Sequence, residues 1–323
     1  YQTMQKVLFA KQLLQQSSLP VEQVAQSCGF DNARALQRAV KQYCKVTPAS
    51  LRKTKNQLEQ APTLTLFLPY RPPYHWEQLR KFLLHRAVAG TETVTDNSYW
   101  RCLGDADGCG YVLAEHRHDK HGFAVTVSVD NLQFTHKVIA SLSRVLDLHA
   151  DPQVIRHALI HAGIPDTLIT KGLRLPGCWS AFEAGCRAIL GQQVSVKAAI
   201  NQVANLTREL GEATSLGTAF PCAESVAESE LTFLKMPGAR KQALRNFASY
   251  CVVNTEIDVK DVLALKGIGP WTVNYLQMRG HSDPDIYLEG DLIVRKIAAQ
   301  HALNPENAHP WRSYLTMQLW QLA

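Results

Sequence analysis

The sequence of 323 residues predicts a mostly α-helical protein with an α+β subdomain and an N-terminal helix-turn-helix. Two short helical segments flank a glycine near the N-terminus, and apolar residues alternate with other residues in two segments further along. Beyond residue 151 the apolar spacing is almost wholly helical. We therefore expect four parts: a helix-turn-helix module at residues 1–53, a linker at 54–62, an α+β subdomain with a small antiparallel sheet at 63–148, and a helical domain at 149–323.

The N-terminal segment has the pattern of a helix-turn-helix. Residues 4–16 and Val21–Ser27 predict helices, and Gly29 supplies the tight turn that follows. Asp31 is expected to cap another helix that runs to about Tyr43. Several polar and basic side chains of this helix are expected to face outward, where they can hydrogen-bond to DNA phosphates and to the acceptor atoms of guanine and adenine. These residues are Asn32, Arg34, Gln37, Arg38 and Lys41. The alternative is a solvated basic face on a small helical module.

The net charge is concentrated in this module. Residues 1–60 hold nine Lys and Arg against three Asp and Glu, so they carry the whole formal charge of +6. This asymmetry predicts a polyanion-binding module attached to a body of balanced charge. The segments Val24–Phe30 and Val46–Arg52 resemble the second half of an AraC-type DNA-binding domain. The resemblance implies that the first of the two helix-turn-helix units of that family is absent from this chain.

Composition excludes several other classes of protein. The sequence has no run of about 18 apolar residues that would predict a membrane span, and no signal-peptide pattern. The eight cysteines lie at least seven positions apart, so no CxxC pair predicts a zinc or redox site. A reducing, cytoplasmic setting fits these free thiols. Because Tyr1 is not a start methionine, we expect the natural N-terminus to lie upstream.

The middle of the chain changes from helical to strand periodicity. Leu64, Leu66 and Leu68 alternate with less apolar neighbours, as do the apolar residues of 123–129, so both segments are expected to be strands. Segments 98–103 and 109–115 are weaker strand candidates. Helices near 75–87 and 135–147 are expected to cover one side of the sheet. Three histidines are expected to decorate an exposed turn, namely His116, His118 and His121.

The most informative motif is a glycine hairpin between two helices. A helix from about Asp258 to Leu265 stops at Gly267-Ile268-Gly269, and the next helix starts with Pro270, a residue that suits the first helical position. Glycines allow the backbone to approach a phosphate closely, and the free N–H groups at the start of a helix can donate hydrogen bonds to it. We therefore expect DNA contacts from Lys266, Gly267, Gly269 and Thr272. Taken alone, a GxG is more often just a turn.

An acid follows this hairpin at a helix boundary. Asp291 lies 22 residues beyond the second glycine, directly before the Leu292–Lys296 segment. An acid at such a boundary is, by itself, more often a helix N-cap than a catalytic group. The hairpin and the acid together resemble the helix–hairpin–helix DNA glycosylase superfamily. The match narrows to the inducible bacterial 3-methyladenine DNA glycosylase II type through segments 72–76, 172–178, 188–196 and 310–314.

The resemblance runs from about residue 66 to 320 and assigns roles to individual residues. It implies that Asp291 is the catalytic aspartate, which stabilises an oxocarbenium-like sugar and orients or activates water. The target nucleotide must be flipped out of the duplex, and aromatic faces suit a cationic alkylated base. The implied base pocket consists of Trp271, Tyr275, Trp320 and Phe82. The alternative for these aromatic residues is an ordinary core role.

Two positions differ from the best-known member of that family. Gln193 stands where that member has an apolar wedge that fills the gap left by the flipped base, and Leu292 stands where it has a tyrosine. Bifunctional relatives carry a Schiff-base lysine at the position of Trp271. Tryptophan cannot form that bond, so the resemblance implies a monofunctional reaction without strand cleavage.

The resemblance therefore implies a DNA repair enzyme that hydrolyses the N-glycosidic bond of alkylated bases, such as 3-methyladenine, in duplex DNA. It would act as a monomer in the bacterial cytoplasm at the nucleoid. No cofactor or metal is required, although the hairpin carbonyls of this family can hold a monovalent cation. The fusion resembles adaptive-response alkylation proteins, but the methyl-accepting PCHR pattern is absent, since Ala223-Glu224 follow Pro221-Cys222. The alternatives are a transcription regulator that uses the glycosylase body as a damage sensor, and an enzyme for deaminated or oxidised bases.

Overall fold

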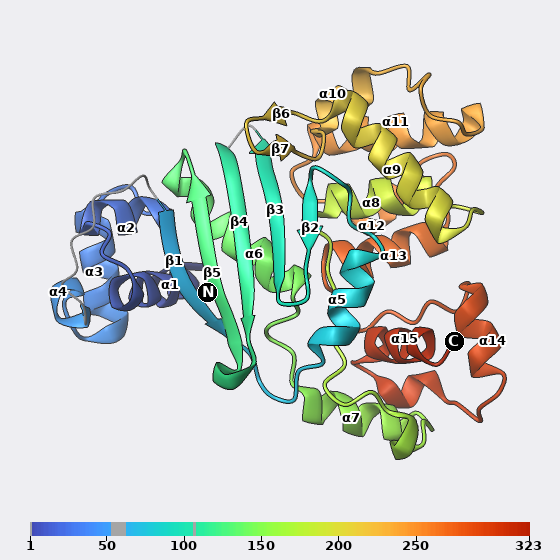
Figure 1. Ribbon diagram of the computed structural model, residues 1–323, viewed down its shortest axis with the longest axis horizontal. Helices are drawn as coiled ribbons and strands as arrows, with labels where there is room; N and C mark the ends of the chain where they lie inside the picture. The colour runs from blue at the N-terminus through green and yellow to red at the C-terminus, as the bar shows by residue number, and fades with distance from the viewer. Residues whose placement is uncertain (1, 53–62, 106–107) are drawn as a thin grey trace.

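The computed structural model describes residues 2–52, 63–105 and 108–323. The expected linker at 54–62 therefore lies outside the described residues. Three parts follow one another along the longest axis (Figure 1): the N-terminal helices in blue, an antiparallel sheet in the centre, and a mostly helical part in yellow to red. Within the described residues no helix is both long and apolar enough to cross a membrane.

The N-terminal helix-turn-helix forms as the sequence predicts. Its helices are α1 (Gln2–Gln16), α2 (Val21–Ser27), α3 (Ala33–Cys44) and the short α4 (Pro48–Leu51). Gly29 makes the turn with a φ of +69°, a backbone conformation that favours glycine. Asn32, not Asp31, caps α3, because its backbone is extended and its Oδ1 accepts a hydrogen bond from the Ala35 N–H at 2.9 Å.

The sheet has the strand order β1-β5-β4-β3-β2, and all of its strand pairs are antiparallel. The strands are β1 (Thr63–Pro69), β2 (Glu92–Val94), β3 (Ser98–Asp105), β4 (Gly108–Arg117) and β5 (Gly122–Val129). Alternation predicted β1 and β5 correctly: Leu66 and Val125 are paired and both are buried. Strand β2 was not predicted, because a segment of three residues is too short to show the alternation of apolar and polar residues that indicates a strand.

Both expected helices pack against the sheet. Helix α6 (Thr135–Val145) lies behind the strands in Figure 1, and its Val138 and Leu142 belong to the core of the sheet. Helix α5 (Trp76–Leu84) lies next to β2, and its Trp76 and Leu79 belong to the same core. The histidine prediction was wrong for His116, which is partly buried on β4 with its ring 5.0 Å from that of Phe123.

Helix α1 joins the helix-turn-helix firmly to the sheet. The outer edge of β1 is paired with side chains of α1: Gln12 Nε2 donates to Phe67 O at 3.1 Å, and Phe67 N donates to Gln16 Oε1 at 2.9 Å. Val7 and Leu13 of α1 are buried in the same core as the sheet. These contacts protect an edge strand that would otherwise expose unpaired backbone groups. The N-terminal module and the body therefore form one packed unit.

The remainder of the chain is helical around two apolar cores. Its helices are α7 (Pro152–His161), α8 (Ala181–Leu190), α9 (Val196–Leu210), α10 (Ala223–Glu228), α11 (Gly238–Val253), α12 (Val259–Ala264), α13 (Pro270–Gly280), α14 (Leu292–Ala298) and α15 (Arg312–Gln321). One core gathers residues of α7, α14 and α15, and the other gathers residues of α8, α9, α11 and α13. The small hairpin of β6 (Ala213–Thr214) and β7 (Gly217–Thr218) interrupts the helices.

Candidate active site and DNA-binding surfaces

The glycine hairpin connects α12 to α13 with the geometry that the sequence predicts. Asp258 caps α12, and Pro270 is the first residue of α13. Gly267 has a φ of +89°, and a Cβ there would lie 2.8 Å from Ala243 Cβ, so only glycine fits. Apart from the adjoining backbone and its two chain neighbours, no described atom lies within 4 Å of a Cβ built at Gly269. The loop is therefore open to a ligand at Gly269, and Lys266 beside it is exposed.

Thr272 has a different role from the one that we expected. Only 3% of its surface is exposed, its N–H donates to Gly269 O at 3.0 Å, and its Oγ1 accepts from Gln192 Nε2 at 3.0 Å. The same Gln192 amide donates to Gly267 O at 3.1 Å. Gln192 thus ties the loop after α8 to the hairpin, a role that sequence reasoning missed. Thr272 acts within this connection, and its side chain is buried rather than open to a ligand.

Gln193, the expected wedge, lies on the same loop. Its side chain is exposed, and its φ of +56° is unusual for a residue other than glycine. Such a conformation persists only where the surroundings hold it in place. The bonds of Gln192 to the hairpin supply that restraint. Gln193 is therefore presented outward from a fixed loop, as a side chain that enters a duplex must be.

Asp291 caps helix α14 and also lines a cavity. Its Oδ1 accepts three hydrogen bonds: from Ile293 N at 2.9 Å, Val294 N at 3.0 Å and Trp320 Nε1 at 3.2 Å. Its Oδ2 accepts none from the described residues. The capping role therefore falls on one oxygen of the carboxylate alone. Three donors on Oδ1 fix the side chain and leave Oδ2 for a ligand.

One cavity of about 480 Å³ brings the predicted residues together. Asp291 lines it together with all four predicted aromatic residues, which are Phe82, Trp271, Tyr275 and Trp320. The rings of Trp271 and Tyr275 are stacked with centroids 5.3 Å apart, because the two residues are four apart on α13. Phe82 and Trp320 face each other at 6.3 Å. A larger hollow of about 950 Å³ lies elsewhere and contains none of these residues.

Leu292 does not shape this cavity. It is 69% exposed and is not a lining residue, whereas the next residue, Ile293, is. The replacement of the family's tyrosine by Leu292 therefore does not change the lining of this cavity.

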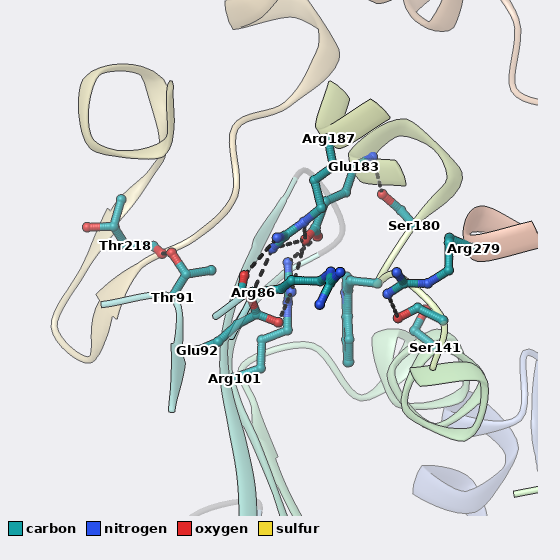
Figure 2. A network of polar contacts seen from close by, with 12 residues as sticks. Arg86, Thr91, Glu92, Arg101, Ser141, Ser180, Glu183, Arg187, Thr218 and Arg279 are labelled. Carbon is teal, nitrogen blue, oxygen red and sulfur yellow. Dashed lines mark hydrogen bonds and ion pairs between the residues drawn. The ribbon is translucent and has the colours of Figure 1, made fainter. Parts of the chain in front are cut away.

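Behind the cavity lies a buried network of ion pairs that joins the sheet to α8 (Figure 2). Arg101 of β3 contacts Glu183 at 2.5 Å and Glu92 at 3.0 Å. Arg187 contacts the same two glutamates, at 2.7 Å and 2.9 Å. Burial raises the pKa of Glu183, but Arg101 and Arg187 outweigh burial and hold that pKa below its usual value. The network fixes the inner wall of the cavity, to which Arg187 belongs.

The predicted recognition helix presents a basic face. Arg34, Gln37, Arg38 and Lys41 of α3 are all exposed, while Leu36 and Val40 on its other side are fully buried. Asn32 is exposed as well, but its side chain is engaged in capping α3. Four of the five predicted side chains are therefore exposed and form no side-chain hydrogen bond or ion pair with the described residues.

Comparison with known proteins identifies the family. The chain is 33% identical over 273 residues to the protein named DNA-3-methyladenine glycosylase 2 of Escherichia coli (strain K12), covering 78% of this chain and 95% of that protein. The chain belongs to the DNA-3-methyladenine glycosylase II family. This glycosylase is accordingly a DNA repair enzyme and a hydrolase. Residues 65–180 also match the family described as the AlkA N-terminal domain.

The N-terminal module of the glycosylase has relatives of its own. Residues 1–54 match a family described as a helix-turn-helix domain. Over 348 aligned residues the glycosylase is 32% identical to the Mycobacterium tuberculosis (strain ATCC 25618 / H37Rv) protein named probable bifunctional transcriptional activator/DNA repair enzyme AlkA, covering 98% of this chain and 69% of that protein. The predicted fusion of an AraC-type module to a glycosylase is confirmed.

Solved structures share the fold of the glycosylase. A 3-methyladenine DNA glycosylase from Archaeoglobus fulgidus has a TM-score of 0.65 at 16% identity, covering 79% of this chain and 96% of that chain. An 8-oxoguanine glycosylase/lyase from Clostridium acetobutylicum, in complex with double-stranded DNA, has a TM-score of 0.56 at 14% identity, covering 77% and 91%. These similarities confirm the predicted helix–hairpin–helix glycosylase fold.

Proposed function

We propose that this glycosylase excises alkylated bases, 3-methyladenine and related lesions, from duplex DNA during base excision repair. One observation carries the proposal: Asp291 lines the same cavity as four aromatic residues and leaves Oδ2 without a partner from the described residues. Aromatic faces attract a cation, and a purine nucleotide alkylated at the ring nitrogen N3 or N7 is cationic. The E. coli relative bears the name of a 3-methyladenine glycosylase.

The chemistry follows from the charge that develops on the sugar. As the bond between C1′ and the base nitrogen breaks, its electron pair moves to the base, and the sugar becomes oxocarbenium-like. The Asp291 carboxylate stabilises that positive charge through Oδ2. Water then forms the new bond to C1′, and its proton leaves through the carboxylate to solvent. A cationic base departs as a neutral molecule, so no general acid is required.

The DNA itself would be held at two further places. The open hairpin at Lys266 and Gly269 would bind backbone phosphate, and exposed Gln193 would enter the stack where the base has left. Trp271 offers no amine for a covalent bond, so the product is an abasic site in an intact strand. We propose a monomeric bacterial enzyme at the nucleoid that requires no cofactor.

A monovalent cation at the hairpin carbonyls remains part of this proposal. Leu265 O and Gly267 O each accept one hydrogen bond, from Ile268 N and from Gln192 Nε2. A carbonyl oxygen has a second lone pair, so both oxygens can still serve as ligands. A bound cation would add positive charge beside the phosphate. None of the described residues forms a cluster of His, Cys, Asp and Glu that could hold another metal ion.

The test is base release from methylated duplex DNA, with the freed base identified by chromatography and the DNA product heated with and without alkali. We expect free 3-methyladenine and strand breaks that appear only after alkali. Binding of damaged DNA without base release would overturn the proposal and favour a damage-sensing regulator. Breaks without alkali would instead show a lyase.

A further inference from the structure

The basic face of α3 and the base cavity lie at opposite ends of the molecule. Along the longest axis in Figure 1, α3 is at one end, the sheet is in the middle, and the helices that line the cavity are at the other end. Helix α1 contacts both α3 and β1, so it lies between the recognition helix and the sheet. At the opposite edge of the sheet, α5 contacts β2. The five strands therefore separate the two surfaces.

The two surfaces also face in opposite directions. Trp76 and Leu79 of α5 are buried in the core of the sheet, whereas Lys81 of the same helix lines the base cavity. The cavity is therefore on the side of α5 that faces away from the sheet. In α3, Leu36 and Val40 are buried toward the other N-terminal helices, and the exposed cations are on the other side of the helix. Each surface thus faces outward from its own end.

One short duplex cannot reach both surfaces. Five strands spaced by about 4.8 Å give a sheet about 19 Å wide. With α5 and α1 at its two edges and α3 beyond α1, about 45–50 Å separate α3 from α5. A straight duplex cannot contact two faces that point away from each other. At the curvature of nucleosomal DNA, about 45° per 10 bp, half a turn requires about 40 bp. A duplex of about 20 bp can therefore occupy only one of the two surfaces.

The connection between the two ends is firm. Gln12 and Gln16 of α1 form hydrogen bonds with Phe67 at the edge of β1. Val7 and Leu13 of the same helix are buried in one core with the strands. Because this contact is buried, α3 cannot swing round to a duplex at the base cavity. The helix-turn-helix is held where it can contact only other DNA.

The chemistry of the α3 face suits an undamaged duplex. Arg34, Arg38 and Lys41 are exposed and form no ion pair with the described residues, so their charges are available to backbone phosphates. Gln37 is exposed on the same side of the helix and can hydrogen-bond to the edge of a base. Neither kind of contact requires a lesion. The base cavity, in contrast, receives a nucleotide that has left the stack.

We propose that one molecule of this glycosylase holds two separate segments of duplex DNA, a damaged segment at the base cavity and an undamaged segment at α3. The contact at α3 keeps the enzyme on the DNA while the base cavity engages a neighbouring segment. The inference rests on the proposed function for the first segment, because that function places the damaged duplex at the base cavity. The second segment rests on α3 alone.

The test is the capture of one duplex by enzyme that is bound to another. Beads carry a duplex of about 20 bp with one tetrahydrofuran abasic-site analogue, which resembles the product and has no base to release. They are saturated with enzyme and washed, and an undamaged fluorescent duplex of the same length and mixed sequence is added at 0.1 M salt. The readout is the fluorescent duplex captured per bead-bound protein. Sedimentation of the free components gives the stoichiometry.

Two variants with equal loss of charge distinguish α3 from the rest of the surface. Arg34→Gln/Arg38→Gln/Lys41→Gln neutralises the face of α3. The matched control removes three positive charges from exposed residues outside the helix-turn-helix and outside the lining of the base cavity. It is Arg117→Gln/Lys120→Gln/Lys171→Gln. Thermal unfolding checks that both variants are folded.

We expect the wild type and the control to capture the fluorescent duplex, in complexes of one protein with two duplexes. The α3 variant should bind the second duplex up to about 500-fold more weakly at 0.1 M salt, because three phosphate contacts contribute about 2.7 to the exponent of the salt dependence. Equal capture by the α3 variant, or an equal loss in the control, would overturn the inference. A complex of two proteins with two duplexes would also overturn it, since a dimer would then form the bridge.

Base release separates this inference from the proposed function. If the wild type releases 3-methyladenine from methylated DNA but captures no second duplex, the inference fails and the proposed function stands. If it captures the second duplex through α3 but releases no base, the proposed function fails, and the molecule bridges DNA without repairing it.

Discussion

Replacing Asp291 by asparagine separates the charge of this side chain from its role as a helix cap. The three hydrogen bonds that Asp291 accepts all end on Oδ1, and an asparagine carbonyl can accept the same three. The amide nitrogen would then replace only Oδ2, which accepts nothing from the described residues. Asparagine and aspartate cap helices about equally well. The fold of Asp291→Asn should therefore be preserved.

The expected magnitudes are far apart for stability and for rate. We expect the free energy of unfolding of Asp291→Asn to change by less than about 0.5 kcal/mol, since the cap is retained. Loss of the charge opposite the developing oxocarbenium should raise the activation barrier by about 3–4 kcal/mol, a loss of about 10²- to 10³-fold in rate. Asp291→Ala should show the same loss of rate and should also lose about 1 kcal/mol of stability with the cap.

Three measurements on both variants separate these effects. Single-turnover base release from methylated duplex DNA gives the rate, thermal unfolding gives the stability, and fluorescence anisotropy with a damaged duplex gives the affinity. The reasoning is refuted if Asp291→Asn retains the wild-type rate within about threefold, far from the loss expected for a removed charge. It is equally refuted if Asp291→Asn is as unstable as Asp291→Ala, because Oδ1 would not then be the capping atom.

Three further predictions concern other parts of the molecule. The variant Arg34→Gln/Arg38→Gln/Lys41→Gln neutralises the exposed face of α3 and should remain folded. The slope of the logarithm of DNA affinity against the logarithm of salt concentration should become shallower by up to about 2.7, at about 0.9 per phosphate contact. An unchanged slope would mean that α3 does not contact DNA. Burial raises the pKa of Asp147 from 3.8 to about 7, so the folded state keeps a proton that the unfolded state releases. The free energy of unfolding should therefore fall by at most about 4 kcal/mol as pH rises from about 4 to 7. In Asp147→Asn this pH dependence should be absent when Tm is measured across the same range. Parallel curves of Tm against pH for the wild type and the variant would contradict the prediction. Glu183→Gln should leave buried Arg101 and Arg187 short of a carboxylate and lower stability by about 3–5 kcal/mol, which an unchanged Tm would disprove.

Local patterns predicted much of the fold because their causes are local. Alternation along β1 and β5 reflects one buried face, and a glycine hairpin followed by Pro270 ends one helix and begins another. The cap of α3 was misplaced by one residue, since Asp31 and Asn32 are both good caps and only the backbone distinguishes them. His116 was misassigned because its aromatic neighbours on α5 and β5 lie far away in the sequence.

The site was predicted only as far as the family resemblance reaches. Asp291 and the four aromatic residues do line one cavity, although they come from α5, α13, α15 and the start of α14. Gln192 could not be identified, because its importance depends on two atoms of a hairpin that lies far away in the sequence. The same holds for Gln12 and Gln16, whose contacts with Phe67 cross the boundary between two parts of the chain.

The docking of α1 on β1 also determines how the N-terminal module should be tested. Deleting residues 1–60 would remove the buried residues Val7 and Leu13 and uncover the edge of β1 at Phe67. Any change in DNA affinity would then be mixed with a loss of packing. Substitution of exposed residues on α3 avoids this problem, since none of them belongs to the core.

The central claim is that a flipped, damaged base occupies the cavity of about 480 Å³ while Asp291 faces its sugar. The most direct test is a crystal structure of the Asp291→Asn variant bound to a duplex with one 7-methylguanine. We expect the base among Trp271, Tyr275 and Trp320, with C1′ about 3–4 Å from the side chain at position 291, as a reacting geometry requires. A base that stays stacked in the duplex, or that enters the larger hollow, would contradict it.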